Sequence, residues 1–141
     1  MVWADWLREK LTRREADHLR RGRLGEKAAK RYLKREGLKF LVANFKTKRG
    51  EIDLIFREDD CLVFVEVKTR SSEGWTRPAA AVDAGKKRRL SMTAMAYLRK
   101  LDNRRVKFRF DIVEVLWGEG CVREIRHLPN AFALAKPYRH H

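Results

Sequence analysis

Two neighbouring apolar segments that flank an acidic turn constrain the fold of this chain more than any other feature. The segments Glu51 to Phe56 and Cys61 to Lys68 are rich in Ile, Val, Leu and Phe, and Glu58, Asp59 and Asp60 lie between them. Short apolar runs on both sides of a polar turn predict a β-hairpin. A sheet therefore has to form around these two strands.

Polarity predicts the register of this hairpin. If Asp59 and Asp60 form the turn, Asp53 lies opposite Glu66 and Glu51 lies opposite Lys68. The expected apolar face then contains Ile52, Leu54, Phe56, Val63, Val65 and Val67, and the other face contains Glu51, Asp53, Glu66 and Lys68 with Ile55, Leu62 and Phe64. A shift by one residue would mix charge into the apolar face, which argues against that register.

The predicted register places two carboxylates, those of Asp53 and Glu66, about 5 Å apart across a strand pair, where like charges destabilise a hairpin. A solvated face with a Glu51–Lys68 ion pair would explain only those two residues, and such a pair contributes about 0–1 kcal/mol. The opposed carboxylates need a cation between them, and oxygen ligands suit Mg²⁺ or Mn²⁺. The spacing also suits phosphodiester hydrolysis, in which the acids hold the metal and Lys68 stabilises developing charge.

A further carboxylate, Glu26, lies near the predicted start of a helix over Leu24 to Glu36, which Gly37 ends. It shares a face with Ala29 and Leu33, so we expect it to point toward the sheet. Two roles stay open for it: it binds the metal through water or orients the attacking water, or it is a favourable acid in a first helical turn.

The remaining pattern predicts a mixed α/β fold. The expected elements are a strand over Leu38–Val42, a loop over Ser71–Pro78, a helix whose face runs from Val82 to Leu101, a strand over Val106–Trp117, a strand over Val122–Ile125 and a short helical segment from Pro129 and Asn130. We expect a helical extension over residues 1–20, one domain over 21–135 and a tail over 136–141. The last two residues, His140 and His141, resemble the remainder of an expression tag, and we exclude them from any site.

The extension carries Trp3, Trp6, Leu7 and Leu11 at helical spacing. Such a stripe could dock on a partner or a membrane, but large exposed apolar patches are uncommon on monomers, so we expect it to pack on its own domain. The two isolated histidines, His18 and His127, are expected in surface or capping roles.

A net charge of +15 and a pI near 10.4 indicate a polyanionic partner, and nucleic acid fits best. The charges are spread along the chain and no apolar run reaches about 20 residues, which argues against a membrane. Two isolated cysteines exclude zinc fingers and small disulfide scaffolds, and together with the absence of a signal sequence they favour the cytoplasm. The candidate phosphate-binding residues are Lys46, Lys48, Arg49 and Arg70 at the ends of the acidic strands, and Lys86 and Lys87, followed by Arg88 and Arg89, at a helix start.

The runs Gly50-Glu51-Ile52-Asp53-Leu54-Ile55 and Phe64-Val65-Glu66-Val67-Lys68, with Arg70, resemble the PD-(D/E)xK nuclease superfamily and, within it, the YraN-like family of bacterial proteins. Further matching positions are Gly25-Glu26, Ala29, Tyr32-Leu33, Gly37, Asn44, Lys86, Leu90, Phe110-Asp111 and Asn130-Ala131-Phe132. The resemblance covers about Arg21 to Phe132 and departs at Lys46, where the family usually has Arg.

The resemblance implies a restriction-endonuclease-like mixed sheet flanked by helices, similar to archaeal Holliday-junction resolvases. It implies a catalytic set of Glu26, Asp53, Glu66 and Lys68, with the Val67 carbonyl as a further Mg²⁺ ligand. Resolvases act as pairs, which leaves a homodimer open for this chain. Fold analogy alone does not assign a substrate.

Three functions therefore compete. The first is a Mg²⁺-dependent endonuclease acting on branched or damaged DNA. The second is a nucleic-acid-binding module that keeps the fold and the metal site without cutting. The third, a basic structural protein of a ribonucleoprotein, makes no use of the opposed carboxylates.

Overall fold

The computed structural model describes residues 2–71, 82–101 and 105–136. Its elements, in chain order, are α1 (Trp3–Arg35), β1 (Lys39–Thr47), β2 (Gly50–Glu58), β3 (Cys61–Ser71), α2 (Ala84–Lys100), β4 (Lys107–Gly118) and β5 (Cys121–Phe132). Among these described residues, neither helix combines the length and the apolar character needed to cross a membrane.

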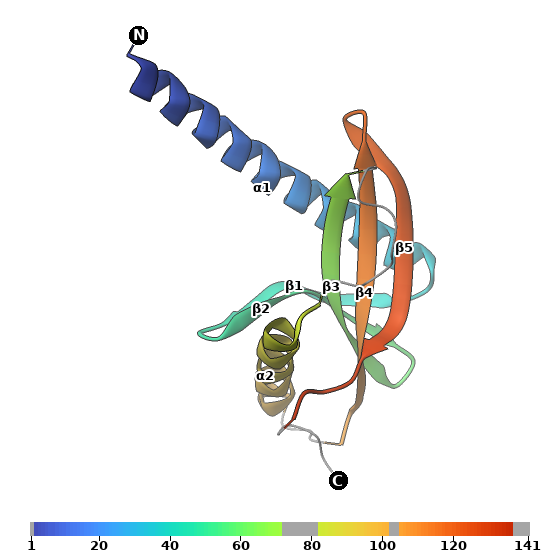
Figure 1. The fold of residues 1–141 in the computed structure, drawn as a ribbon. Helices are drawn as coiled ribbons and strands as arrows, with labels where there is room; N and C mark the ends of the chain where they lie inside the picture. The colour runs from blue at the N-terminus through green and yellow to red at the C-terminus, as the bar shows by residue number, and fades with distance from the viewer. Residues whose placement is uncertain (1, 72–81, 102–104, 137–141) are drawn as a thin grey trace.

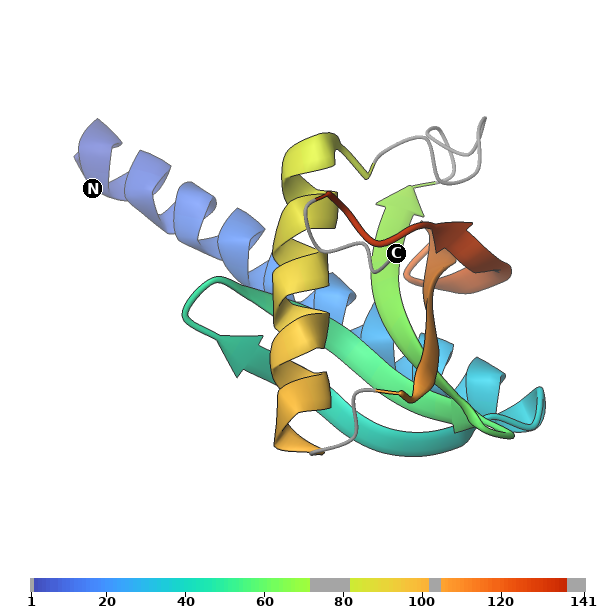
Figure 2. The same cartoon turned by 90° about the horizontal axis from the view of Figure 1, so that it is seen from below.

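The five strands form one sheet in the order β1-β2-β3-β4-β5. Only the β3–β4 pair is parallel, and the connection between these two strands contains α2. One core cluster packs α2 against the sheet through Leu90, Ala94 and Leu98. A second cluster packs α1 against the sheet through Ala29 and Leu33, so the helices cover different faces (Figures 1 and 2). The predicted mixed α/β fold is confirmed.

The β2–β3 hairpin has the predicted turn and register. Leu54 pairs with Val65, and Glu58 pairs with Cys61 on either side of the Asp59–Asp60 turn. The ladder ends at Leu54 and Val65, so the expected Asp53–Glu66 and Glu51–Lys68 pairs lie beyond it. The two strands separate where the carboxylates begin.

The expected apolar face is wrong at one position, Ile52. This side chain packs with Ile55 on the α2 face, whereas Leu54 packs on the α1 face. The alternation therefore breaks at Asp53. In the β1–β2 ladder Ala43 pairs with Leu54 and Phe45 with Ile52, and the intervening Asn44 has φ 54°. Asparagine tolerates this left-handed backbone conformation. Asn44 lies in the ladder beside the point where the side-chain alternation of β2 changes.

The first helix differs from the predicted one because it is continuous from Trp3 to Arg35. It ends as expected: Gly37 has φ 96° and donates to the Lys34 carbonyl. The expected domain boundary at residues 20/21 falls inside α1, and Glu26 lies in mid-helix. The role of Glu26 as a first-turn acid is therefore excluded.

The N-terminal half of α1 does not pack on the domain, contrary to expectation. Trp3 is 72% exposed and Leu11 is 51% exposed, and every residue from 2 to 21 is classed as exposed. Figure 1 shows this half of the helix projecting away from the sheet. Charged residues interrupt the stripe, and the described strands do not extend far enough to cover it.

The C-terminal helical segment expected at Pro129 and Asn130 is also wrong, because β5 continues to Phe132. Asp111, fully buried, accepts a hydrogen bond from the Asn130 backbone N–H at 2.9 Å. This bond holds a bulge between β4 and β5, where Asn130 has φ 50°.

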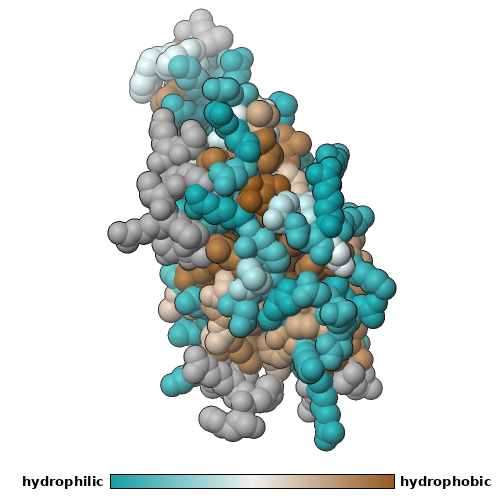
Figure 3. Space-filling model, turned by 90° about the vertical axis from the view of Figure 1, so that its right-hand side faces the viewer, coloured by the Kyte–Doolittle hydropathy of each residue, from teal (hydrophilic) through white to brown (hydrophobic). Residues whose placement is uncertain are grey.

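β5 forms an edge of the sheet, and Figure 3 shows hydrophilic and hydrophobic residues side by side on this side of the molecule.

Candidate functional site: an acidic pocket between α1 and the sheet

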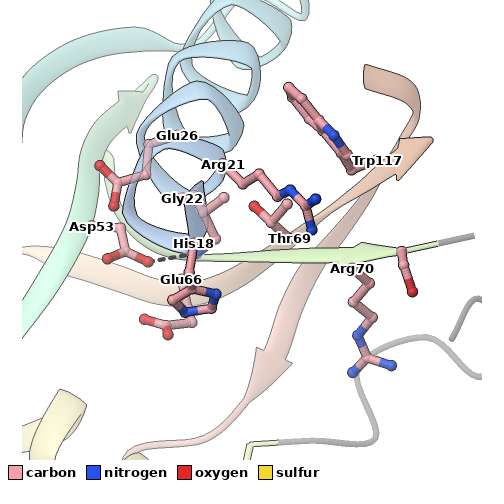
Figure 4. Close-up of a pocket in the computed structure, with 11 residues that line it drawn as sticks. His18, Arg21, Gly22, Glu26, Asp53, Glu66, Thr69, Arg70 and Trp117 are labelled. Carbon is pink, nitrogen blue, oxygen red and sulfur yellow. Dashed lines mark hydrogen bonds between the residues drawn. The ribbon is translucent and has the colours of Figure 1, made fainter. Parts of the chain in front are cut away.

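A pocket of about 280 Å³ opens where α1 crosses the ends of β3 and β4. Its lining residues are His18, Arg21, Gly22, Glu26, Asp53, Glu66, Val67, Thr69, Arg70, Ser71 and Trp117. Figure 4 shows Glu26, Asp53 and Glu66 gathered at one end, and Arg21 and Trp117 at the other. The pocket therefore has an acidic end and a basic, aromatic end.

Close packing of α1 on β3 brings Glu26 to the pocket. Gly25 is buried against Thr69, and a Cβ at residue 25 would overlap the Thr69 hydroxyl. Glycine therefore permits the helix to approach the strand. The neighbouring Glu26 lies at the pocket rim, on the side of α1 that faces the sheet, as the sequence predicts.

Asp53 lies in the opening between β2 and β3. Its Oδ2 accepts a hydrogen bond from the Val67 backbone N–H at 2.8 Å. The bond joins the two strands beyond the last ladder pair. Asp53 thus replaces a strand–strand hydrogen bond with a carboxylate contact.

Glu66 is buried on β3, with its side chain 7% exposed, and forms an ion pair with Lys86 at the start of α2. The next charged residue on β3, Lys68, is half-buried. Burial, together with the positive charges of Lys86 and Arg70, lowers the pKa of Lys68, while Glu66 opposes this shift. The carboxylate of Glu66 therefore lies among three cationic side chains, those of Lys68, Arg70 and Lys86.

Burial and neighbouring carboxylates raise the pKa values of Asp53 and Glu26. Burial, followed by the charge of Glu66, raises the pKa of Asp53 from its ordinary 3.8 to about 8, and the Val67 N–H only partly offsets this. Burial and the charges of Glu51 and Glu66 raise the pKa of Glu26. Like charges in a partly buried site need a proton or a cation, so this end of the pocket favours a cation.

Asn44 connects two of the acids. With its amide oriented to satisfy both contacts, its nitrogen donates to Glu51 Oε1 at 2.9 Å and to Glu26 Oε2 at 3.2 Å. Lys46 lies 4.0 Å from the other oxygen of Glu51. Glu51 therefore lies next to Glu26 and Lys46, and not opposite Lys68 in a ladder.

The carboxylates of the acidic pocket are not arranged as the ligands of a metal ion in this structure. Within the part of the chain that the structure describes, no three His, Cys, Asp or Glu side chains converge closely enough to hold an ion. Two of the acids have other partners: Lys86 pairs with Glu66, and Asn44 contacts Glu26. Asp53 and Glu66 offer the hard oxygen ligands that Mg²⁺ requires, but the Lys86 ammonium would have to leave Glu66 first.

The predicted phosphate-binding residues are not all in one place. Arg70 lines the acidic pocket, and Lys86 contacts its Glu66. In contrast, Lys48 and Arg49 lie at the β1–β2 turn beside α2, and Lys87 lies 5.9 Å from the Phe132 ring. The expected surface is therefore divided, because the long β1–β2 hairpin moves its turn away from the acids.

Sequence reasoning missed half of the pocket. His18 lies in the expected helical extension, Arg21 lies just before the helix expected from Leu24, and Trp117 lies near the end of β4; none of them was predicted to line the site. The signal for His18 was present: helical spacing of four residues leads from Glu26 back to Gly22 and His18. His18 is thus an exposed residue, as expected, but one that lines the pocket.

The fold and the pocket define an α/β protein with carboxylates from a helix and two separating strands. A model of the family described as "Uncharacterised protein family UPF0102" matches residues 25–115. This chain belongs to the UPF0102 family. The matched segment contains Glu26, Asp53, Glu66 and Lys68 and excludes the exposed half of α1.

Individual UPF0102 proteins are similar over most of their length. That of Rhodococcus opacus (strain B4) is 41% identical over 117 residues, which cover 83% of this chain and 99% of the relative. That of Geobacter metallireducens is 40% identical over 114 residues, or 81% and 93% of the two chains. That of Syntrophus aciditrophicus is 42% identical over 125 residues, or 86% and 95%.

Proposed function

We propose that the acidic pocket is a metal-dependent nuclease site that hydrolyses phosphodiester bonds in branched or damaged DNA. One observation carries the proposal: three elements bring Glu26, Asp53 and Glu66 together in a pocket whose lining also includes Arg21 and Arg70. Carboxylates at one end suit a divalent cation, and guanidinium groups at the other suit phosphate. This arrangement and the sequence resemblance support the same superfamily of nucleases.

We assign roles to these residues from their placement and from the sequence resemblance. Asp53, Glu66 and the Val67 carbonyl would hold Mg²⁺ or Mn²⁺, and Glu26 would contact the ion through water. When bound, the ion would supply a water of lowered pKa and neutralise phosphate charge. Lys68 is half-buried on the same strand as Glu66, so its ammonium would stabilise charge that develops on the phosphate.

The Glu66–Lys86 ion pair favours a second candidate function, a nucleic-acid-binding module that does not cut. In that case Lys86 remains the counter-ion of Glu66, and the carboxylates serve the structure. Metal dependence separates the two functions, because only the nuclease needs the ion.

A cleavage panel tests the proposal. Branched, nicked, duplex and single-stranded DNA are incubated with Mg²⁺ or Mn²⁺ and compared with a chelator. We expect metal-dependent cleavage that Asp53→Ala and Glu66→Ala abolish, and that Asp60→Ala, at the exposed β2–β3 turn, leaves intact. Cleavage that survives Asp53→Ala would contradict the assignment of the site, and metal-independent binding without cleavage would favour the second function.

A further inference from the structure

A second groove, of about 450 Å³, lies where the tip of the β1–β2 hairpin meets α2. Its lining residues are Thr47, Lys48, Arg49, Met92, Met95, Ala96 and Arg99. It shares no lining residue with the acidic pocket. Figure 2 shows the hairpin tip extending beside α2, which places this groove, the tip groove, on the α2 side of the hairpin.

The tip groove is built by a close approach of backbones. A Cβ at Gly50 would lie 2.9 Å from Thr93 Oγ1 and 3.4 Å from the Arg89 carbonyl oxygen. Glycine therefore lets the end of the hairpin rest on α2. The residue before Gly50, Arg49, lines the groove and reaches α2, where its Nη1 lies 3.5 Å from Met92 Sδ.

The charged residues that line the tip groove are all cations. These three residues, Lys48, Arg49 and Arg99, are all exposed. No carboxylate lines the groove, and over residues 2–71, 82–101 and 105–136 none of the three cations forms an ion pair. Three adjacent exposed cations attract an anion with more than one charge.

The floor of the tip groove is apolar. Met92, Met95 and Ala96 are half-buried between the cations. Methionine adapts its shape to irregular partners, and a sugar–phosphate backbone presents charged and apolar groups in alternation. A nucleic-acid backbone matches both the cationic rim and the apolar floor.

We propose that the tip groove binds the backbone of a second nucleic-acid segment, separate from the one whose phosphodiester enters the acidic pocket. The proposal rests on the proposed function for the first segment. A branched substrate presents two segments in different directions, so it occupies both sites at once. A short linear duplex has one direction and engages mainly one site.

The test compares two double variants with the same charge change. Arg49→Glu/Arg99→Glu alters the tip groove, and Arg13→Glu/Arg31→Glu alters exposed positions on α1 that line neither site. Binding of fluorescent four-way junction and linear duplex DNA is measured by anisotropy in chelator at several salt concentrations. Circular dichroism and melting curves check that each variant folds.

We expect the groove variant to weaken junction binding about tenfold more than the α1 variant does and to reduce the log–log salt slope by about two, since each phosphate contact contributes about 0.9. Its effect on the linear duplex should be smaller. Equal losses from both variants would overturn the proposal, because net charge alone would then explain binding.

A separate titration with Mn²⁺ distinguishes this inference from the proposed function. The groove variant should bind Mn²⁺ as the unaltered protein does. If neither protein binds Mn²⁺ and the junction-selective loss persists, the nuclease proposal fails while the second nucleic-acid site stands. If Mn²⁺ binds and the selective loss is absent, only the tip groove proposal fails.

Discussion

The Asp53 carboxylate accepts the Val67 backbone N–H at 2.8 Å just beyond the point where the β2–β3 ladder ends. At this position the Asp53 carboxylate, whose pKa is raised, takes the place of a backbone carbonyl as the partner of the Val67 N–H. The fold places Asp53 where the strands separate, next to Glu66 and Glu26. The cost of this arrangement in the metal-free protein can be measured.

Asp53→Asn should stabilise the metal-free protein in a pH-dependent way. Because the folded pKa of Asp53 is raised from 3.8 to about 8, its contribution to the free energy of unfolding is greatest below pH 3.8 and declines as the pH rises toward 8. The asparagine can still accept the Val67 N–H but carries no charge. Between pH 4 and pH 9, the melting temperature of Asp53→Asn should therefore exceed that of the unaltered protein by a difference that grows with pH and levels off above pH 8.

Asp17→Asn, on the exposed half of α1, is the control and should show no such trend. An Asp53→Asn protein that melts below the unaltered protein at pH 8 would mean that Asp53 and Glu66 do not repel each other. The geometry of the acidic pocket would then be wrong.

Gly25→Ala should destabilise the fold, although alanine is the better helix former by about 1 kcal/mol. The new methyl group would overlap the Thr69 hydroxyl, and overpacking costs about 1–3 kcal/mol. Urea unfolding measures the change. Gly22→Ala is a matched control on the same helix, since its Cβ would meet nothing within 4 Å, and it should be neutral or stabilising. Failure of Thr69→Ala to rescue Gly25→Ala would contradict the close approach.

Asp111→Asn should destabilise the protein by about 2–3 kcal/mol, because hydrogen bonds to charged groups contribute about 1.5–3 kcal/mol. Burial raises the pKa of Asp111, but hydrogen bonds from His127, Arg109 and the Asn130 N–H outweigh burial and lower it below 3.8. Its contribution to stability is therefore present above pH 3.8 and is lost as the pH falls through the lower folded value.

Urea unfolding at pH 7 and at pH 3 tests this. The difference between Asp111→Asn and the unaltered protein should be large at pH 7 and smaller at pH 3. A difference that is the same at both pH values would assign the loss to packing and not to the carboxylate charge.

The sequence predicts those features of the fold that depend on local pattern. Alternation and the Asp59–Asp60 turn predict the hairpin register, and helical spacing with Gly37 predicts the end of α1. The continuity of α1 was missed because few apolar side chains mark helical spacing between Leu11 and Leu24, and Gly22 and Gly25 lie at the end of that stretch. The structure shows that one faces open space and the other a close tertiary contact.

The site was predicted in part for the same reason. Glu26 and Glu66 lie at positions that local periodicity defines, and they line one pocket with Asp53, at which the alternation of β2 breaks. The Glu66–Lys86 pair and the Asn44 contact depend on how α2 and β1 pack, which no local pattern encodes. The change of face at Ile52 was missed because a left-handed Asn44 cannot be recognised from alternation alone.

Calorimetric titration with Mn²⁺ tests the central claim, that the acids of the pocket hold a divalent ion, most directly. We expect the unaltered protein to bind at millimolar or better affinity, and Asp53→Asn and Glu66→Gln to bind at least about tenfold more weakly, since each loses a charged oxygen ligand. Lys68→Ala should bind as the unaltered protein does. Equal binding heats in all four proteins would contradict the claim and place the ion elsewhere.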